Sequence, residues 1–292
     1  MRISNAGLFV IASAIWGSTW LAITFQLGTV APELSVAYRF AIASAIVAVW
    51  CKAIGQPLAF PLREHAWLMA MGATFFGLNY VGVYWAERYV ASGLVAVVFS
   101  TIVFMSAIGM RLVFGEPLTV RTLLAAALGV TGVALLFLPQ LSAAREGGWA
   151  ALGIGIALVA TAFATVGNLI AVRNHRVGLP TLPVTAWGML YGALVSVIVA
   201  AITGVPWTFE WTAGYVLSLA YLAVFGSVFA FAAYLTLLKR VGAAPSSFVG
   251  IATPVIALAL STLFEGYRWT WVGAVGLALA VFGNWLALRG KR

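Results

Sequence analysis

Long apolar runs, separated by short polar, proline-rich or glycine-rich breaks, occupy almost all of this chain of 292 residues. A membrane-spanning helix needs about 20 mostly apolar residues. The pattern predicts ten such helices, near residues 5–28, 33–51, 66–86, 91–113, 119–139, 148–172, 181–203, 212–237, 243–264 and 270–288. Because the connections are short, we expect no separate soluble domain. The fold class predicted from the pattern is therefore an all-α membrane protein.

The composition excludes the other broad classes of protein. Hydrophobic residues make up 63% of the chain and charged residues 8%, whereas soluble domains have about 45–50% and about 25%. An aromatic content of 13% argues against disorder. A transmembrane barrel would show short segments of alternating polarity, which the long apolar runs do not. With Cys51 as the single cysteine, an internal disulfide or a multi-cysteine metal site is excluded.

The basic residues predict the orientation of the chain in the membrane. With a cytoplasmic N-terminus, twelve of the 16 Lys and Arg residues fall on the inner side and three on the outer side; the remaining one is Arg39. Cytoplasmic segments of membrane proteins are enriched in Lys and Arg. We therefore expect both termini in the cytoplasm and the protein in the inner (plasma) membrane. The net charge of +9 is then a topology signal, and no nucleic-acid partner is expected.

The predicted helices divide into two sets of five at the polar break 140–147. We expect two repeats, residues 1–140 and 141–292, that form one membrane unit. A shift of 151 residues places Val90 on Val241, and other matches at this shift are sparse. An odd number of helices in each repeat gives the two repeats opposite orientations. Inverted repeats are characteristic of secondary transporters, although a bundle with no transport role is an alternative.

Several short segments resemble one transporter family. They are Ala14–Ser18 (AIWGS), Tyr38–Phe40 (YRF) after Pro32, Gly115–Thr119 (GEPLT), and Ala243–Pro245 (AAP) followed by Thr253-Pro254. In this order and spacing they resemble EamA-type carriers of the drug/metabolite transporter superfamily. The resemblance implies ten helices in two inverted repeats and export or exchange of small metabolites. Within the family, the chain is most similar to bacterial exporters of aromatic amino acids.

Arg39 lies inside the second predicted helix, where an ionisable side chain is costly and marks a functional candidate. Its guanidinium could bind a substrate carboxylate, or it could act as a structural lock bonded to a neighbouring helix. The resemblance implies that carriers of different substrates share this arginine. That implication favours the structural role.

The carboxylates fall at predicted helix ends or in loops, at Glu33, Glu64, Glu87, Glu116, Glu146, Glu210 and Glu265. A proton relay or a drug-cation antiporter usually needs a carboxylate within the membrane. We therefore expect a facilitated carrier that needs no proton gradient. The sequence also lacks a P-loop, so we expect no use of ATP.

Tyrosine, tryptophan and polar residues within the helices predict a central cavity, because their N–H and O–H groups need partners away from water. The candidate substrate-binding residues are Trp16, Asn79, Tyr80, Tyr84, Asn168, Trp187, Tyr191, Tyr234, Ser246 and Ser247. For the rings, ordinary packing is the alternative. For Asn79 and Asn168, hydrogen bonds between helices are equally compatible with the pattern. Close contact between small residues is the alternative for the two serines.

These observations favour a membrane transporter that exports small amphipathic metabolites, especially aromatic or hydrophobic amino acids, by alternating access without ATP. Export of aromatic drug cations is an alternative. A sugar-phosphate or nucleotide-sugar carrier is disfavoured, because a dianion calls for more than one cation. His65 and His175 lie at helix ends, so we expect no enzyme, metal or cofactor. The expected partners are a small-molecule substrate and the lipid bilayer, and the sequence does not indicate an oligomeric state.

Overall fold

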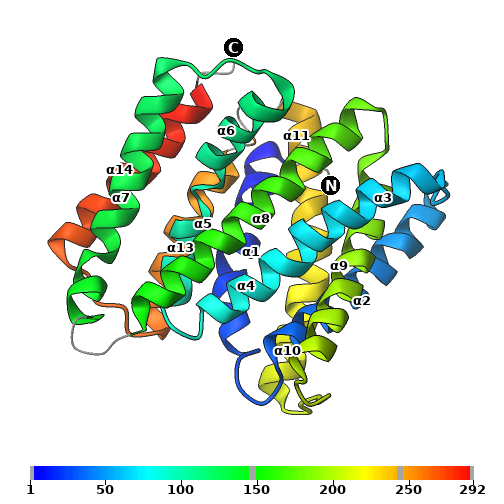
Figure 1. The fold of residues 1–292 in the computed structure, drawn as a ribbon, viewed down its shortest axis with the longest axis horizontal. Coiled ribbons are helices and arrows are strands. Elements are labelled where there is room, and N and C mark those ends of the chain that lie inside the picture. Colours follow the sequence, from blue (N-terminus) through cyan, green and yellow to red (C-terminus); the bar gives the residue numbers. More distant parts are fainter. Residues whose placement is uncertain (1–2, 145–148, 242–245, 247, 290–292) are drawn as a thin grey trace.

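The computed structural model describes residues 3–144, 149–241, 246 and 248–289, and helices account for most of them (Figure 1). Within these residues there is no β-strand. The α-helices are α1 (Asn5–Thr24), α2 (Pro32–Ala53), α3 (Leu62–Met71), α4 (Asn79–Ala86), α5 (Ser92–Phe99), α6 (Ile102–Phe114), α7 (Val120–Ala144), α8 (Ala150–Arg176), α9 (Thr181–Thr203), α10 (Ala213–Ala220), α11 (Ala230–Val241), α13 (Phe248–Phe264) and α14 (Trp271–Arg289). Two π-helical segments, η1 (Gly72–Leu78) and η2 (Tyr221–Phe229), join α3 to α4 and α10 to α11. The prediction of an all-helical chain is confirmed.

Among the described residues, seven helical stretches are long and apolar enough to cross a membrane, and three shorter apolar helices accompany them. The seven stretches are Asn5–Thr24, Pro32–Ala53, Leu62–Ala86, Ser92–Phe114, Ala150–Arg176, Thr181–Thr203 and Ala213–Leu238. The shorter ones are Val120–Leu136, Phe248–Phe264 and Trp271–Ala287. That all ten cross the membrane stays a prediction, as do the inverted repeat and the location of the termini.

The π-helical segments are stabilised by side chains that bond to carbonyl groups of the wider turn. Asn79 Nδ2 donates to the carbonyl of Phe75 at 3.0 Å, and Ser227 Oγ donates to the carbonyl of Leu222, five residues earlier, at 2.9 Å. A π-helical turn frees backbone carbonyls from the regular ladder and is frequent at functional sites. These two polar residues therefore have a structural task in the middle of their helices.

Small residues allow the closest helix contacts. Helix α7 packs along α14 at one side of the bundle, and α2 packs along α9 at the other (Figure 1). A side-chain carbon added to Gly132 would lie 2.4 Å from the backbone nitrogen of Ala280, and one added to Gly72 would lie 2.5 Å from the carbonyl oxygen of Gly188. Backbones at this distance exclude larger side chains, as is common at helix contacts in membranes.

One predicted helix, 91–113, is interrupted in the structure. Helix α5 ends at Phe99 and α6 begins at Ile102. Between them, Ser100 Oγ donates to the carbonyl of Val97 and Thr101 Oγ1 to that of Val98, both at 2.7 Å. Such local bonds offer the backbone an alternative to the regular helix and bend it.

Candidate functional site

The structure brings Trp16, Arg39, Tyr80, Tyr84 and Ser227 together, and we call these residues the central cluster. Arg39 on α2 is 2% exposed, and its Nε donates to Ser227 Oγ at 3.2 Å. Its guanidinium carbon lies 4.7 Å from the centre of the Tyr80 ring. Nη1 of Arg39 has no hydrogen-bond partner. The cluster therefore presents a buried cation with one free donor.

Segment η2 connects this cation to α1. Trp16 Nε1 donates to the carbonyl of Gly226 at 3.1 Å, and the Trp16 ring lies 5.3 Å from that of Tyr234. A carbon added to Gly226 would lie 2.8 Å from Cγ2 of Thr19 and 3.5 Å from Nη2 of Arg39. Glycine is thus needed here for α1, α2 and η2 to meet.

Tyr80, Tyr84 and Glu87 follow one another along one face of α4 and its C-terminal end, because residues three and four apart share a helix face. Tyr84 is fully buried, and its hydroxyl makes no hydrogen bond of standard geometry, although the guanidinium of Arg39 lies close enough to interact with it. It lies within electrostatic range of both Arg39 and Glu87. This face of α4 extends the central cluster towards the end of the bundle.

Glu87 stands one residue beyond the apolar stretch Leu62–Ala86, yet its side chain is 8% exposed. Neither carboxylate oxygen has a hydrogen-bond partner. Burial raises the pKa of the Glu87 carboxyl well above its usual range, nearby Glu265 raises it further, and Arg39 lowers it. As the sequence predicts, Glu87 and Glu33 lie at helix ends, at the C-cap of α4 and in the first turn of α2. Both residues are nevertheless buried, Glu33 at 2% exposed, so a position at a helix end does not place a carboxylate in water. The expectation of a carrier without proton coupling stays a prediction.

Two further carboxylates at this end bond to neutral donors. Glu265 accepts from the backbone nitrogen of Ser92 at 3.1 Å and from its hydroxyl at 2.6 Å, and Ser261 Oγ also donates to it. Glu33 Oε1 accepts from Trp85 Nε1 at 2.9 Å. An acceptor at the first residues of a helix, here α5, is favoured by the helix dipole. We call Glu33, Glu87 and Glu265 the carboxylate end.

A cavity of about 190 Å³ lies at the carboxylate end. It is lined by residues 27–32 and 205–206, with Trp85 and Arg88. The guanidinium of Arg88 covers the Trp85 ring at 4.6 Å. The cavity therefore borders Arg88, the residue after Glu87, and Trp85, two residues before it.

Trp187 and Tyr191, also predicted from the sequence, form a separate group on α9 with His65 of α3. The Trp187 and Tyr191 rings stack at 5.7 Å, and Tyr191 Oη lies 2.9 Å from His65 Nδ1. Trp187 Nε1 donates to the carbonyl of Leu58 at 2.8 Å. The sequence predicts no catalytic or metal-binding role for His65, because it lies at a helix end. The structure gives it three aromatic neighbours, Phe60, Trp187 and Tyr191.

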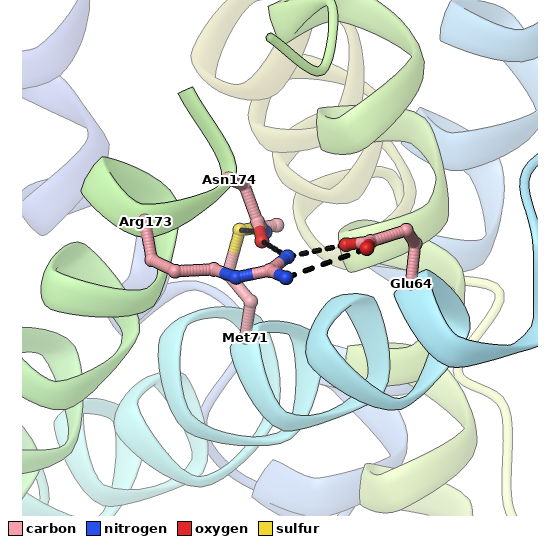
Figure 2. A network of polar contacts seen from close by, with 4 residues as sticks. All are labelled: Glu64, Met71, Arg173 and Asn174. Atoms are coloured by element: carbon pink, nitrogen blue, oxygen red, sulfur yellow. Dashed lines mark hydrogen bonds and ion pairs between the residues drawn. The ribbon is translucent and has the colours of Figure 1, made fainter. Parts of the chain in front are cut away.

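Figure 2 shows an ion-pair network near this group. Arg173 at the end of α8 pairs with Glu64 on α3 and donates to Asn174 Oδ1 at 3.2 Å. Asn174 Nδ2 in turn donates to Met71 Sδ at 3.8 Å. One turn from there, Arg176 pairs with Glu116 at 2.6 Å. We call Glu64, Glu116, Arg173 and Arg176 the ion-paired end.

The remaining candidate residues are not members of the central cluster. Asn79 is buried and stabilises η1, with its Oδ1 unpartnered. Asn168 is exposed on α8, next to the buried Gly167, and joins none of the clusters. Ser246 is buried and bonds to Tyr234. Ser247 lies outside the described residues.

Comparison with known proteins decides the family. The EamA-like transporter family matches residues 4–138 and again residues 151–289. The chain belongs to the EamA-like transporter family. It is accordingly a membrane transporter, and its apolar helices make it a multi-pass protein of the inner membrane.

Full-length relatives agree with this membership. Protein PagO of Salmonella typhimurium is 25% identical over 274 residues, covering 91% of this chain and 86% of PagO. The uncharacterized inner membrane transporter YedA of Escherichia coli is 28% identical over 285 residues, covering 95% and 88%. A crystal structure of 21% sequence identity superposes with a TM-score of 0.68 over 98% of this EamA-family chain and 97% of its own. That likeness shows the shared fold.

Proposed function

We propose that this EamA-family transporter exports small amphipathic metabolites, with aromatic and other hydrophobic amino acids as the substrate class, by alternating access and without ATP. The central cluster carries this proposal. It combines the free Nη1 of Arg39, which can bind a carboxylate, with the rings of Trp16, Tyr80 and Tyr84. A charge-assisted bond to a carboxylate is about twice as strong as a neutral one. An aromatic amino acid offers both the carboxylate and the ring.

The contacts between helices support alternating access between two halves. Helix α1 packs against α13 and α11, and α8 packs against α6 and α4 in the same pattern. Segments η1 and η2 occupy the corresponding position, the third helical stretch of each half. The family match also occurs twice in the chain. Two copies of opposite orientation, rocking around a site between them, account for these paired features.

The two other substrate classes fit the cluster less well. A drug cation would need free aromatic faces, but the guanidinium of Arg39 already lies over Tyr80 at 4.7 Å and Phe40 at 5.1 Å. A phosphorylated solute needs more than one cation. Within the described residues, Arg39 is the one cation of the central cluster. A carboxylate is thus the anion that matches its charge.

Counterflow tests the proposal directly. The purified protein, in liposomes loaded with unlabelled phenylalanine, is given labelled phenylalanine or tryptophan outside. We expect rapid uptake of label that protein-free liposomes do not show, and weaker uptake of labelled alanine. Exchange of sugar phosphates or drug cations with no exchange of amino acids would contradict the proposed substrate class.

Thiol labelling tests the orientation that export requires. We expect the ion-paired end to be cytoplasmic and the carboxylate end to face outward. Gln56 and Trp211 are exposed at opposite ends, and Cys51 is buried. In intact spheroplasts, an impermeant maleimide should label Trp211→Cys and should reach Gln56→Cys only after permeabilisation. The reverse pattern would overturn the orientation.

A further inference from the structure

Four buried side chains of the central cluster and the carboxylate end hold polar atoms without hydrogen-bond partners. They are Nη1 of Arg39, Oη of Tyr84, Oε2 of Glu33 and both carboxylate oxygens of Glu87. All four side chains are more than nine-tenths buried. A buried polar group without a partner is rare in native proteins and calls for a ligand or a change of protonation.

The groups that face Glu87 come from several elements. Tyr84 lies on its own helix, Arg39 on α2, and Glu265 follows the end of α13. Glu265 is itself bonded to Ser92 and Ser261, so three donors contact its carboxyl oxygens. Glu87 has no such donor. Of the two neighbouring carboxyl groups, Glu87 is the one whose charge nothing nearby stabilises by hydrogen bonding.

We propose that Glu87 is a proton-binding site, which holds a proton while the carboxylate end is closed and releases it when that end opens. A proton needs no cavity, and it removes the cost of an unpartnered charge at a site that is 8% exposed. On opening, water reaches the carboxyl group from the cavity beside Trp85 and Arg88. The carboxylic acid then gives its proton to water and becomes a carboxylate, which water now solvates.

The proton site adds a proton-binding step to the proposed function. It rests on that function in one respect, because opening of the carboxylate end is taken to be a step of transport. Each cycle of closing and opening at this end would then bind and release one proton. Transport would depend on pH, contrary to the expectation from helix-end positions alone. The proton site itself exists or not whatever the substrate is.

Infrared difference spectroscopy of the full protein in lipid nanodiscs tests the site without any substrate. Between pH 4 and pH 9, we expect a carboxylic acid band whose midpoint lies well above about 4.3, the ordinary value for Glu. The band should be absent in Glu87→Gln, an uncharged variant of the same shape. Glu210→Gln, a carboxylate bonded to Thr212 near the start of α10, is the matched control and should keep it.

A third variant makes the assignment independent of the folding of Glu87→Gln. Removal of the neighbouring charge by Glu265→Gln should move the midpoint of the band to lower pH, because a like charge raises a carboxyl pKa. Absence of the high-pH band in the unmodified protein, or its persistence in Glu87→Gln, would overturn the proposal. So would a midpoint that Glu265→Gln leaves unchanged.

Counterflow of labelled phenylalanine at equal pH on both sides separates this proposal from the proposed function. We expect the rate in the unmodified protein to change with pH around the infrared midpoint, and the rate in Glu87→Gln to lose that dependence. Exchange with no pH dependence in the unmodified protein would contradict the link to transport. If no amino acid exchanges, the proposed function fails and the infrared result alone decides the proton site.

Discussion

At the ion-paired end, Glu64 and Glu116 each form an ion pair with an arginine near the end of α8. At the carboxylate end, Glu33 and Glu265 accept hydrogen bonds from neutral donors, and Glu87 accepts none. The residue type is the same and the helix-end position is the same. What differs is the group that lies opposite each carboxylate.

From this difference in partners we expect the two ends to respond to different signals. An ion pair between partly exposed side chains weakens as salt screens it. A buried carboxyl group without partners responds instead to pH, because its charge is costly until water arrives. Under the proposed alternating access, the two ends would then be controlled separately.

The largest effect is expected from Arg39, the buried cation between the two ends. Arg39→Ala removes a charged hydrogen bond to Ser227 and leaves an unfilled volume beside Phe40 and Tyr80. We expect a loss of about 3 kcal/mol or more in stability. Thermal unfolding in detergent measures it, with Arg88→Ala at an exposed site as the control. A stable Arg39→Ala protein that still exchanges carboxylate substrates would contradict both the structural role of Arg39 and its proposed contact with a substrate carboxylate.

A smaller loss is expected when the fixed charge of the carboxylate end is removed. Glu265→Gln keeps the shape but replaces charge-assisted bonds to Ser92 and Ser261 by neutral ones. We expect about 1.5 kcal/mol of destabilisation at neutral pH. Chemical denaturation followed by tryptophan fluorescence measures it. Glu87→Gln should show the opposite sign at high pH, where the folded protein otherwise meets the cost of the buried charge.

That sign follows from linkage. The pKa of Glu87 is raised in the folded protein, so the folded state keeps a proton that the unfolded chain releases above about pH 4.3. Stability therefore falls as the pH rises from there until the folded pKa is passed. Glu87→Gln should lack this fall. Parallel pH profiles for the two proteins would show that Glu87 is ionised in both states.

Truncation of an aromatic ring that contacts the substrate should weaken binding of an aromatic substrate by about 0.5–1.5 kcal/mol more than binding of alanine. If the central cluster binds the ring of the substrate, Tyr80→Ala should weaken counterflow of phenylalanine more than that of alanine. Trp187 stacks near the other end, with His65 and Tyr191. Trp187→Ala should then affect both substrates alike. Equal effects of both variants on both substrates would make the rings packing elements.

The smallest effect is expected at the ion-paired end. Arg176 and Glu116 are 47% and 44% exposed, so Arg176→Gln should cost about 0.2–1 kcal/mol, less at high salt. Arg173 and Glu64 are more buried, at 20% and 17%, and Arg173→Gln should cost more. Thermal unfolding at low and high salt measures both. A larger effect of Arg176→Gln would contradict this ranking.

The sequence predicted the helices well because apolar runs of this length have few alternatives. It ended the helix near 172, whereas α8 continues through Arg173 to Arg176. Polar residues with good helix propensity extend a helix beyond its apolar stretch, and an apolar pattern does not mark their end. The π-helical segments and the break at Ser100 depend on side-chain bonds that leave no periodic signal.

For the candidate site, periodicity predicted which residues share one helix face, but it did not predict which residues on different helices would meet. Tyr80 and Tyr84 share a face as expected, and so do Trp187 and Tyr191. The pattern did not reveal that Arg39 and Ser227 would meet, or that the two aromatic groups would lie apart. It also did not reveal the burial of Glu87, because neighbouring helices rather than sequence position determine the exposure of a helix end.

Segment η1 has a consequence for how this protein tolerates change in length. A π-helical turn arises when one residue is added to an α-helix, and each residue of an α-helix turns the chain by about 100°. Removal of one residue before Tyr80, with the wide turn of η1 kept, would rotate everything beyond the deletion by that angle. Tyr80, Tyr84 and Glu87 would then point away from Arg39, although none of them had been changed. The phase of the helix is therefore as much a part of the site as its side chains.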